Sequence, residues 1–143
     1  MRVYLVQHGQ AQPEEVDSER RLTARGIQET RAVAAFLKPL KIKVENIWHS
    51  GKPRARQTAE ILAAAVKCRK GLVKRNSLGP KDPVEPLILR LKNKDRDVMI
   101  VGHLPFLSKL AALLLTGREE LEPVCFVNSG VICLERSPGS KWS

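Results

Sequence analysis

Short apolar runs rich in Val, Ile and Leu alternate along this chain with longer segments of helical periodicity, and this alternation constrains the fold most. Strands that alternate with helices of about 10–15 residues favour a mainly parallel sheet with helices on both faces. The sequence therefore predicts an α/β fold, a three-layer α/β/α sandwich around a mainly parallel central sheet. Strands are predicted at residues 2–7, 46–49, 71–76, 97–101 and 124–134, and helices beginning near Thr23, Pro53, Asp82 and Pro105.

The chain length of 143 residues suits one domain, which we expect at residues 1–136, followed by a loose tail at 137–143. No stretch reaches the roughly 20 apolar residues of a membrane span, and we see no secretory signal. The three cysteines lack the spacing of a metal site and favour free thiols in a reducing cytoplasm. Two of them, Cys125 and Cys133, stand among apolar residues and are expected in the core.

Polar residues directly follow several of the predicted strands. His8 follows the first strand, Ser50 the second, and His103 comes shortly after the strand at 97–101. The segment 128–130, Asn-Ser-Gly, interrupts the last strand. Because ligands of such sheets bind at the carboxyl ends of the strands, we expect these segments to converge on one site.

Four motifs occur along the chain in a fixed order. Residues 7–9 read Gln-His-Gly, 22–26 Leu-Thr-Ala-Arg-Gly, 50–60 Ser-Gly-Lys-Pro-Arg-Ala-Arg-Gln-Thr-Ala-Glu, and 101–105 Val-Gly-His-Leu-Pro. Together they resemble the histidine phosphatase superfamily, also called phosphoglycerate-mutase-like, and within it the small SixA-type phosphohistidine phosphatase branch. The resemblance covers almost the whole chain, and it implies a phosphatase with the phosphoglycerate-mutase-like fold.

The resemblance also implies a role for each site residue. His8 would be the nucleophile that forms a covalent phosphohistidine. Arg54 would bind the phosphate oxygens, and His103 would stabilise the equatorial oxygens during transfer. Gly9 would leave space for the phosphoryl group, and a backbone N–H near Ser129 would complete the site. Side chains already supply the positive charge, so we expect no metal and no cofactor.

One position departs from the family pattern, because Gln7 stands where the family has Arg before His-Gly. Glutamine keeps a donor but lacks the charge and the two-pronged geometry of Arg, and loss of one such donor typically costs about 10²–10³ in rate. We therefore expect a weakened or specialised phosphatase, with a non-catalytic phosphate-binding module as the alternative. Lys52 and Arg56 are the candidates to replace the missing charge.

Many family members carry a carboxylic general acid before the penultimate strand, and here Asp82 and Glu85 are the candidates. Glu85 would equally complement the dipole of a helix start. A phosphohistidine substrate would need no such acid, because its P–N bond is weak and imidazole can leave protonated. The short connection at 75–83 leaves no room for a large cap, which favours a phosphorylated protein over a small phosphorylated substrate.

The net charge of +10 is concentrated in residues 51–96, which hold 13 Lys/Arg against 4 Asp/Glu. Such a surface attracts phosphate, acidic protein or nucleic acid, or it is a solvated basic face. The chain lacks interleaved aromatic residues and Gly-rich RNA loops, so the sequence disfavours a nucleic-acid-binding protein. The spacing of His49 from the other histidines does not suit a metal, and we expect His49 at the rim of the site or at a strand end.

Overall fold

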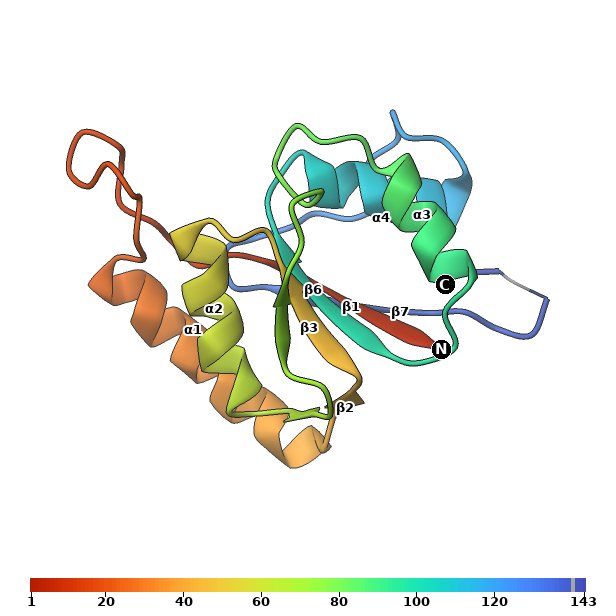
Figure 1. Cartoon of the computed structure of the whole chain (residues 1–143), viewed down its shortest axis with the longest axis horizontal. Coiled ribbons are helices and arrows are strands. Elements are labelled where there is room, and N and C mark those ends of the chain that lie inside the picture. Colours follow the sequence, from red (N-terminus) through yellow and green to blue (C-terminus); the bar gives the residue numbers. More distant parts are fainter. Residues whose placement is uncertain (140) are drawn as a thin grey trace.

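The computed structural model describes residues 1–139 and 141–143. Across these residues, a five-stranded sheet has the order β5-β3-β6-β1-β7 (Figure 1). β5, β3, β6 and β1 are parallel, and β7 runs antiparallel to β1. The prediction of an α/β fold with a mainly parallel sheet is confirmed. The strands are β1 (Arg2–Gln7), β3 (Asn46–His49), β5 (Leu72–Lys74), β6 (Val98–Gly102) and β7 (Val131–Glu135).

Helices cover both faces of the sheet. α1 (Ala24–Leu37) and α2 (Pro53–Ala63) lie on one face, and α3 (Glu85–Lys92) and α4 (Phe106–Thr116) lie on the other (Figure 1). Local signals account for their ends. The Thr23 side chain caps α1 by accepting the Gly26 N–H at 2.8 Å. Gly117 ends α4 in the left-handed conformation, with φ of +75°.

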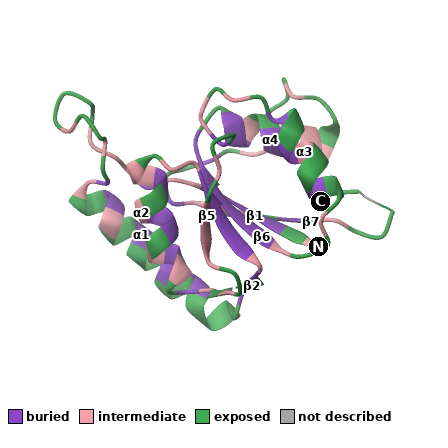
Figure 2. Ribbon diagram, viewed as in Figure 1, coloured by how far each residue is buried: buried purple, intermediate pink, exposed green. Residues whose placement is uncertain are grey.

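Successive residues of the central strands point into different helical layers. In β1, Val3 and Leu5 pack with residues of α3 and α4, whereas Tyr4 and Val6 pack with residues of α1 and α2. All of β6 is buried, so its apolar run is continuous rather than alternating. Figure 2 shows the buried strands between helices whose outer faces are exposed. This two-sided core holds the carboxyl ends of the strands in a fixed arrangement.

Some local predictions were wrong. β7 begins at Val131 rather than Val124, because residues 127–130 form a turn in which the Gly130 N–H donates to the Val127 carbonyl at 3.0 Å. Cys125 and Cys133 are exposed rather than buried. Cys133 lies in β7 at the edge of the sheet, where its side of the strand is not covered.

Three short elements were not expected from the sequence. β2 (Lys43–Val44) and β4 (Lys67–Cys68) pair in parallel as a small second sheet. A 3₁₀ turn, η1 (Lys38–Leu40), joins α1 to β2. Elements this short contain too few residues to produce a recognisable periodicity.

The chain end was expected to be a loose tail, but its described residues return to the sheet. Glu135 and Ser143 exchange two backbone hydrogen bonds of 2.9 Å. The Arg136 guanidinium lies 5.5 Å from the ring centroid of Trp142. The division into a domain at 1–136 and a tail stays a prediction.

Candidate active site

His8 and His103 lie side by side at the carboxyl edge of the sheet. His8 follows β1, and its backbone N–H continues the ladder by donating to the Gly102 carbonyl at 3.0 Å. His103 follows β6. Because β1 and β6 are adjacent and parallel, both histidines leave the sheet at the same edge. Their ring centroids are 5.0 Å apart, with the ring planes at 55°.

The tautomer of His8 is set by the residue that follows it. Nδ1 of His8 lies 2.7 Å from the Gly9 carbonyl oxygen. A carbonyl oxygen only accepts, so Nδ1 carries the hydrogen and the lone pair of the neutral ring is at Nε2. Burial lowers the pKa of His8 below 6.5; the hydrogen bond to Gly9 opposes this, and nearby Arg54 and Arg20 add to it. His8 is therefore neutral at pH 7 and has a nucleophilic Nε2.

His103 is a buried donor held by Ser50. Its Nε2 lies 2.6 Å from Ser50 Oγ, and its Nδ1 has no hydrogen-bond partner among the described residues. Burial first, then His8 and the neighbouring cations, lower the pKa of His103 to about 3. When the Ser50 hydroxyl donates to Nε2 of the neutral ring, Nδ1 carries the hydrogen. His103 can then donate to an anion without being charged itself.

Arg54 lies in the first turn of α2, after the N-cap residue Lys52 and Pro53. Its Nε is buried and has no hydrogen-bond partner among the described residues. Burial, followed by repulsion from Arg20, lowers the pKa of the Arg54 guanidinium. A guanidinium at the positive end of a helix, beside a second cation, is an arrangement that binds an anion.

Arg20 is a cation of this site that the sequence did not reveal. Its φ is +50°, a left-handed conformation that costs a residue with a side chain about 1 kcal/mol. Its Nε donates to the Gln12 carbonyl at 3.0 Å. Its charge lowers the pKa of His8, Arg54 and His103. Arg20 reaches the site because the loop between β1 and α1 returns toward the sheet, and no sequence motif indicates this path.

The two residues expected to replace the charge missing at Gln7 behave differently. Lys52 lies close enough to lower the pKa of His103. Arg56 instead forms an ion pair with Glu60 one turn along α2, with Nε and Oε1 3.5 Å apart. Lys52 and Arg20 are therefore the additional cations near the two histidines.

Gly9 is required by the packing beneath the site. A Cβ at Gly9 would lie 2.7 Å from Thr30 Oγ1, 3.1 Å from Ser129 Oγ and 3.2 Å from the Gly26 carbonyl. The Gly9 N–H donates to Thr58 Oγ1 at 2.9 Å. Room for a phosphoryl group beside Gly9 stays a prediction, and the packing of protein atoms gives a second reason for glycine here. Gly9 thus anchors the His8 loop to α1 and α2.

Gln7 and Ser129 hold the loop before β7 in place. Gln7 Nε2 donates to Asn128 Oδ1 at 3.0 Å, which directs the amide toward that loop. The Ser129 N–H donates to the Gln7 carbonyl at 3.0 Å, so the backbone donor expected near Ser129 is not that of Ser129 itself. Ser129 Oγ lies 2.8 Å from Thr30 Oγ1. Both residues support the site, and Ser129 has no free backbone donor for a ligand.

The two candidate general acids lie in different surroundings. Asp82 lines a cavity of about 640 Å³ that also contains Ser50, the partner of His103. Its Oδ2 accepts the Gly79 N–H at 2.7 Å. Glu85 is exposed in the first turn of α3 and is not among the residues that line this cavity. Of the two, only Asp82 lies beside the histidine site.

His49 and Trp48 have structural positions rather than places at the rim. His49 is 6% exposed, and its Nδ1 accepts the Gly51 N–H at 3.1 Å. Trp48 is buried, with the Arg75 guanidinium 4.5 Å from its ring centroid. Of the two places that the sequence allowed for His49, the rim or a strand end, the structure has the strand end, because His49 is the last residue of β3. Within the described part of the chain, no group of three or more His, Cys, Asp or Glu could hold a metal ion.

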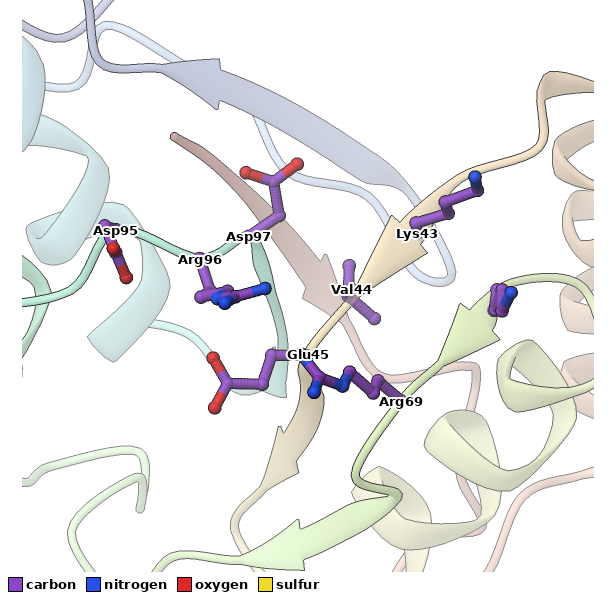
Figure 3. Close-up of a pocket in the computed structure, with 8 residues that line it drawn as sticks. Lys43, Val44, Glu45, Arg69, Asp95, Arg96 and Asp97 are labelled. Carbon is purple, nitrogen blue, oxygen red and sulfur yellow. The ribbon is translucent and has the colours of Figure 1, made fainter.

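A second cavity, of about 420 Å³, lies at the opposite edge of the sheet, before β3 and β6. Figure 3 shows Arg69 and Arg96 pointing toward each other beside Glu45. Glu45 already forms ion pairs with Lys70 and Lys94, both at 2.9 Å. This cavity holds no histidine and is separate from the site at His8. In residues 1–139 and 141–143, no helix is long and apolar enough to cross a bilayer.

Two adjacent histidines and a helix-start arginine at the carboxyl edge of an α/β sheet are the arrangement expected of a histidine phosphatase. The sequence model of the histidine phosphatase superfamily (branch 1) matches residues 3–76, which contain His8 and Arg54. The chain belongs to this superfamily.

Proteins similar to this chain include SixA phosphohistidine phosphatases. The chain is 29% identical over 136 residues to the phosphohistidine phosphatase SixA of Escherichia coli K12, a match that covers 92% of this chain and 83% of that protein. It is 35% identical over 130 residues to an uncharacterized protein of Picosynechococcus, covering 82% and 75% of the two chains. The structure of the protein histidine phosphatase SixA complexed with tungstate superposes with a TM-score of 0.86 at 26% identity, covering 100% and 93%. The predicted resemblance to the SixA type is confirmed.

Proposed function

We propose that this protein is a phosphatase that removes a phosphoryl group from protein phosphohistidine through a covalent phosphohistidine on His8. The observation that carries the proposal is the hydrogen bond of 2.7 Å between His8 Nδ1 and the Gly9 carbonyl. This bond leaves Nε2 as the attacking nitrogen, beside His103 and Arg54.

In the first step, the lone pair of His8 Nε2 forms a bond to phosphorus while the bond from phosphorus to the leaving nitrogen or oxygen breaks. The negative charge spreads over the equatorial oxygens, and His103 Nδ1 and the Arg54 guanidinium donate to these oxygens. In the second step, water attacks the phosphorus, the P–N bond to His8 breaks, and inorganic phosphate leaves. His8 Nε2 recovers its lone pair and the ring is again neutral with its hydrogen on Nδ1, while the protons of the water leave with the phosphate or pass to solvent.

The nature of the leaving group supports phosphohistidine as the substrate. Imidazole departs readily once protonated, so its release needs little help from the protein. Asp82 lies in the adjoining cavity but is bonded to the Gly79 N–H, and Glu85 lies outside that cavity. The similarity to SixA proteins, one of them solved with the oxyanion tungstate, supports the same substrate class.

A second candidate, a phosphate-binding module without turnover, is favoured by Gln7. Its side chain donates to Asn128 and carries no charge, so one transition-state donor of the family is replaced by a structural contact. Such a module would still bind phosphate through Arg54 and His103, but no phosphoryl group would reach His8.

Labelling of His8 separates the two candidates. The wild-type protein and His8→Gln are each mixed with a histidine-phosphorylated protein carrying ³²P, and both released phosphate and acid-labile label on the enzyme are measured. We expect release and transient label with wild type and neither with His8→Gln. Equal release by both would contradict the nucleophilic role of His8. Phosphate binding by wild type with no label and no release would identify the module instead.

A matched histidine variant controls for nonspecific loss of structure. His49→Gln removes another buried histidine of the same edge, 6% exposed, that we do not place in the reaction. It should be labelled like wild type. Far-ultraviolet circular dichroism of each variant verifies the fold.

A further inference from the structure

The surface beside the Ser50–His103 pair is hollowed by a cavity of about 640 Å³. It lies at the carboxyl ends of β3 and β5 and is bounded by the loop that leads to α3. It shares Ser50 with the histidine site, so groups attached to a phosphoryl group at His8 can extend into it. The lining residues are Ser50, Gly51, Lys52, Lys74, Asn76, Gly79, Pro80, Lys81 and Asp82.

The charge of this cavity is strongly positive. Lys52, Lys74 and Lys81 line it, and none of them takes part in an ion pair within the described residues. The one carboxylate in the lining, Asp82, is bonded to the Gly79 N–H at 2.7 Å, and this contact closes its own loop. Three ammonium groups around one hollow produce a potential that attracts an anion.

The position of Lys74 is fixed by its neighbour strand. Lys74 pairs with His49 in the register of β3 and β5, and its stem crosses Gly51. A Cβ at Gly51 would lie 2.9 Å from Lys74 Cδ and 3.0 Å from Cγ, and Gly51 has φ of +88°. The left-handed φ favours glycine at this position, and a side chain here would displace the flexible Lys74 stem. The absence of a side chain there allows the Lys74 stem to lie along the wall of the cavity, next to Ser50 and Lys52.

We propose that this lysine cavity binds a second anionic group of the same substrate, an acidic group close to the phosphorylated position. The inference rests on the phosphoryl site at His8, but it does not require that the phosphoryl group turns over. The inference deepens the proposed function, because a cavity of this kind would favour substrates with an acidic group near the phosphorylated position over substrates without one. Because these lysine side chains are exposed, salt screens their attraction for the acidic group, and the preference for acidic substrates should weaken as salt is added.

Affinity for non-hydrolysable ligands tests the cavity without turnover. Two benzylphosphonates are compared by calorimetry, one with a ring carboxylate and one with the uncharged carboxamide. In wild type, two exposed ion pairs of ordinary strength between the lysines and the ring carboxylate should give about a fivefold higher affinity for the carboxylate ligand than for the carboxamide ligand. In the double variant Lys74→Gln/Lys81→Gln this preference should fall to less than about twofold. Equal affinity of wild type for the two ligands, or binding of neither, would overturn the proposal.

The matched control removes the same charge elsewhere. Lys43 and Lys67 are cross-strand neighbours in the small sheet and line the cavity at the opposite edge. Lys43→Gln/Lys67→Gln lowers the net charge equally and should keep the fivefold preference. If this control loses the preference as the cavity variant does, the effect is general electrostatic attraction and the proposal fails.

A third ligand distinguishes the sources of the acidic group. A ring with two phosphonates that binds more than about tenfold tighter than the carboxylate identifies a doubly phosphorylated substrate. Affinity within tenfold of the carboxylate identifies an acidic side chain next to the phosphorylated residue. A carboxylate preference in a protein that releases no phosphate supports the cavity and contradicts the phosphatase function, so the two can fail separately.

Discussion

Ser50 Oγ lies 2.6 Å from Nε2 of His103, a contact that joins the end of β3 to the end of β6 inside the candidate active site. The Lys52 N–H donates to the same hydroxyl oxygen at 3.3 Å, so the start of α2 is joined to this contact as well. When this hydroxyl donates to Nε2, His103 presents Nδ1–H to an anion.

Replacing Ser50 should therefore slow the reaction through His103. Ser50→Ala is expected to lower kcat about fivefold, because a hydrogen bond of this kind contributes about 1 kcal/mol to holding the His103 ring. Ser50→Thr retains the hydroxyl and should recover most of the rate. Steady-state kinetics with phenyl phosphate measure both, and Ser108→Ala in α4 is the matched serine control. Equal kcat for Ser50→Ala and wild type would remove Ser50 from the mechanism.

Removal of the Arg20 charge should change both rate and pH dependence. His8 must be neutral to attack, so the acid limb of kcat/KM lies below pH 6.5 in wild type, as the lowered pKa of His8 requires. Arg20→Gln removes a cation that lowers this pKa, so the acid limb should move to higher pH. Loss of a cation that attracts the phosphoryl group should separately lower kcat/KM at pH 7 about tenfold. The pH–rate profile measures both effects.

The control for Arg20 is an arginine of the exposed face of α1. Arg25 forms an ion pair with Glu29, with Nε and Oε1 3.2 Å apart. Arg25→Gln should leave the profile unchanged. An acid limb that stays in place in Arg20→Gln would show that its guanidinium does not act on His8.

Restoring the family arginine should accelerate the reaction. Gln7→Arg adds a charged donor at the carboxyl end of β1. One transition-state donor typically changes the rate by about 10²–10³, and we expect kcat to rise at least about tenfold. Gln7→Met serves as the control, because it removes the hydrogen bond to Asn128 without adding charge. Phosphate release from phenyl phosphate is the measurement. A kcat for Gln7→Arg no higher than that of Gln7→Met would indicate that the missing charge does not limit turnover.

Burial of His103 should make the protein less stable in acid. Its pKa is lowered from 6.5 to about 3 in the folded state, so between these values the unfolded chain binds a proton that the folded chain does not. Its contribution to the free energy of unfolding is complete above pH 6.5 and is lost as pH falls toward 3. From pH 7 to pH 5 the loss is about 2 kcal/mol.

Urea unfolding at pH 7 and pH 5 measures this loss. His103→Gln cannot take up the proton, so its stability should change by about 2 kcal/mol less than that of wild type over the same interval. His8 and His49 also have lowered pKa values and remain in both proteins, so the difference isolates His103. The same pH dependence in both proteins would contradict the buried neutral state.

Periodicity and strand-end residues predicted most of the fold and the main members of the site. The central strands have long apolar runs because both their faces are covered, and this pattern is visible without a structure. His8 directly follows β1, and His103 directly follows Gly102, the last residue of β6. Adjacent parallel strands then bring the two histidines together, as expected from the topology rule.

Predictions failed where a position depended on the path of a loop or on an uncovered edge. Cys133 has apolar neighbours in the sequence, but it lies on the open side of an edge strand. The path of the loop before β7 also gives Ser129 a φ of +63° and directs its N–H to the Gln7 carbonyl. The close contacts of Gly9 with α1 and with this loop likewise come from tertiary packing.

The sequence by itself determined the order of strands and helices, the placement of the two histidines at strand ends and the departure at Gln7. These properties are local, because burial leaves a periodic pattern and a motif is a run of neighbours. Tertiary structure alone decided which cations surround the histidines, which hydroxyl contacts His103, and that three lysines line the adjoining cavity. Such contacts join residues far apart in the chain, and their energies depend on distances of a few ångströms that no sequence pattern records.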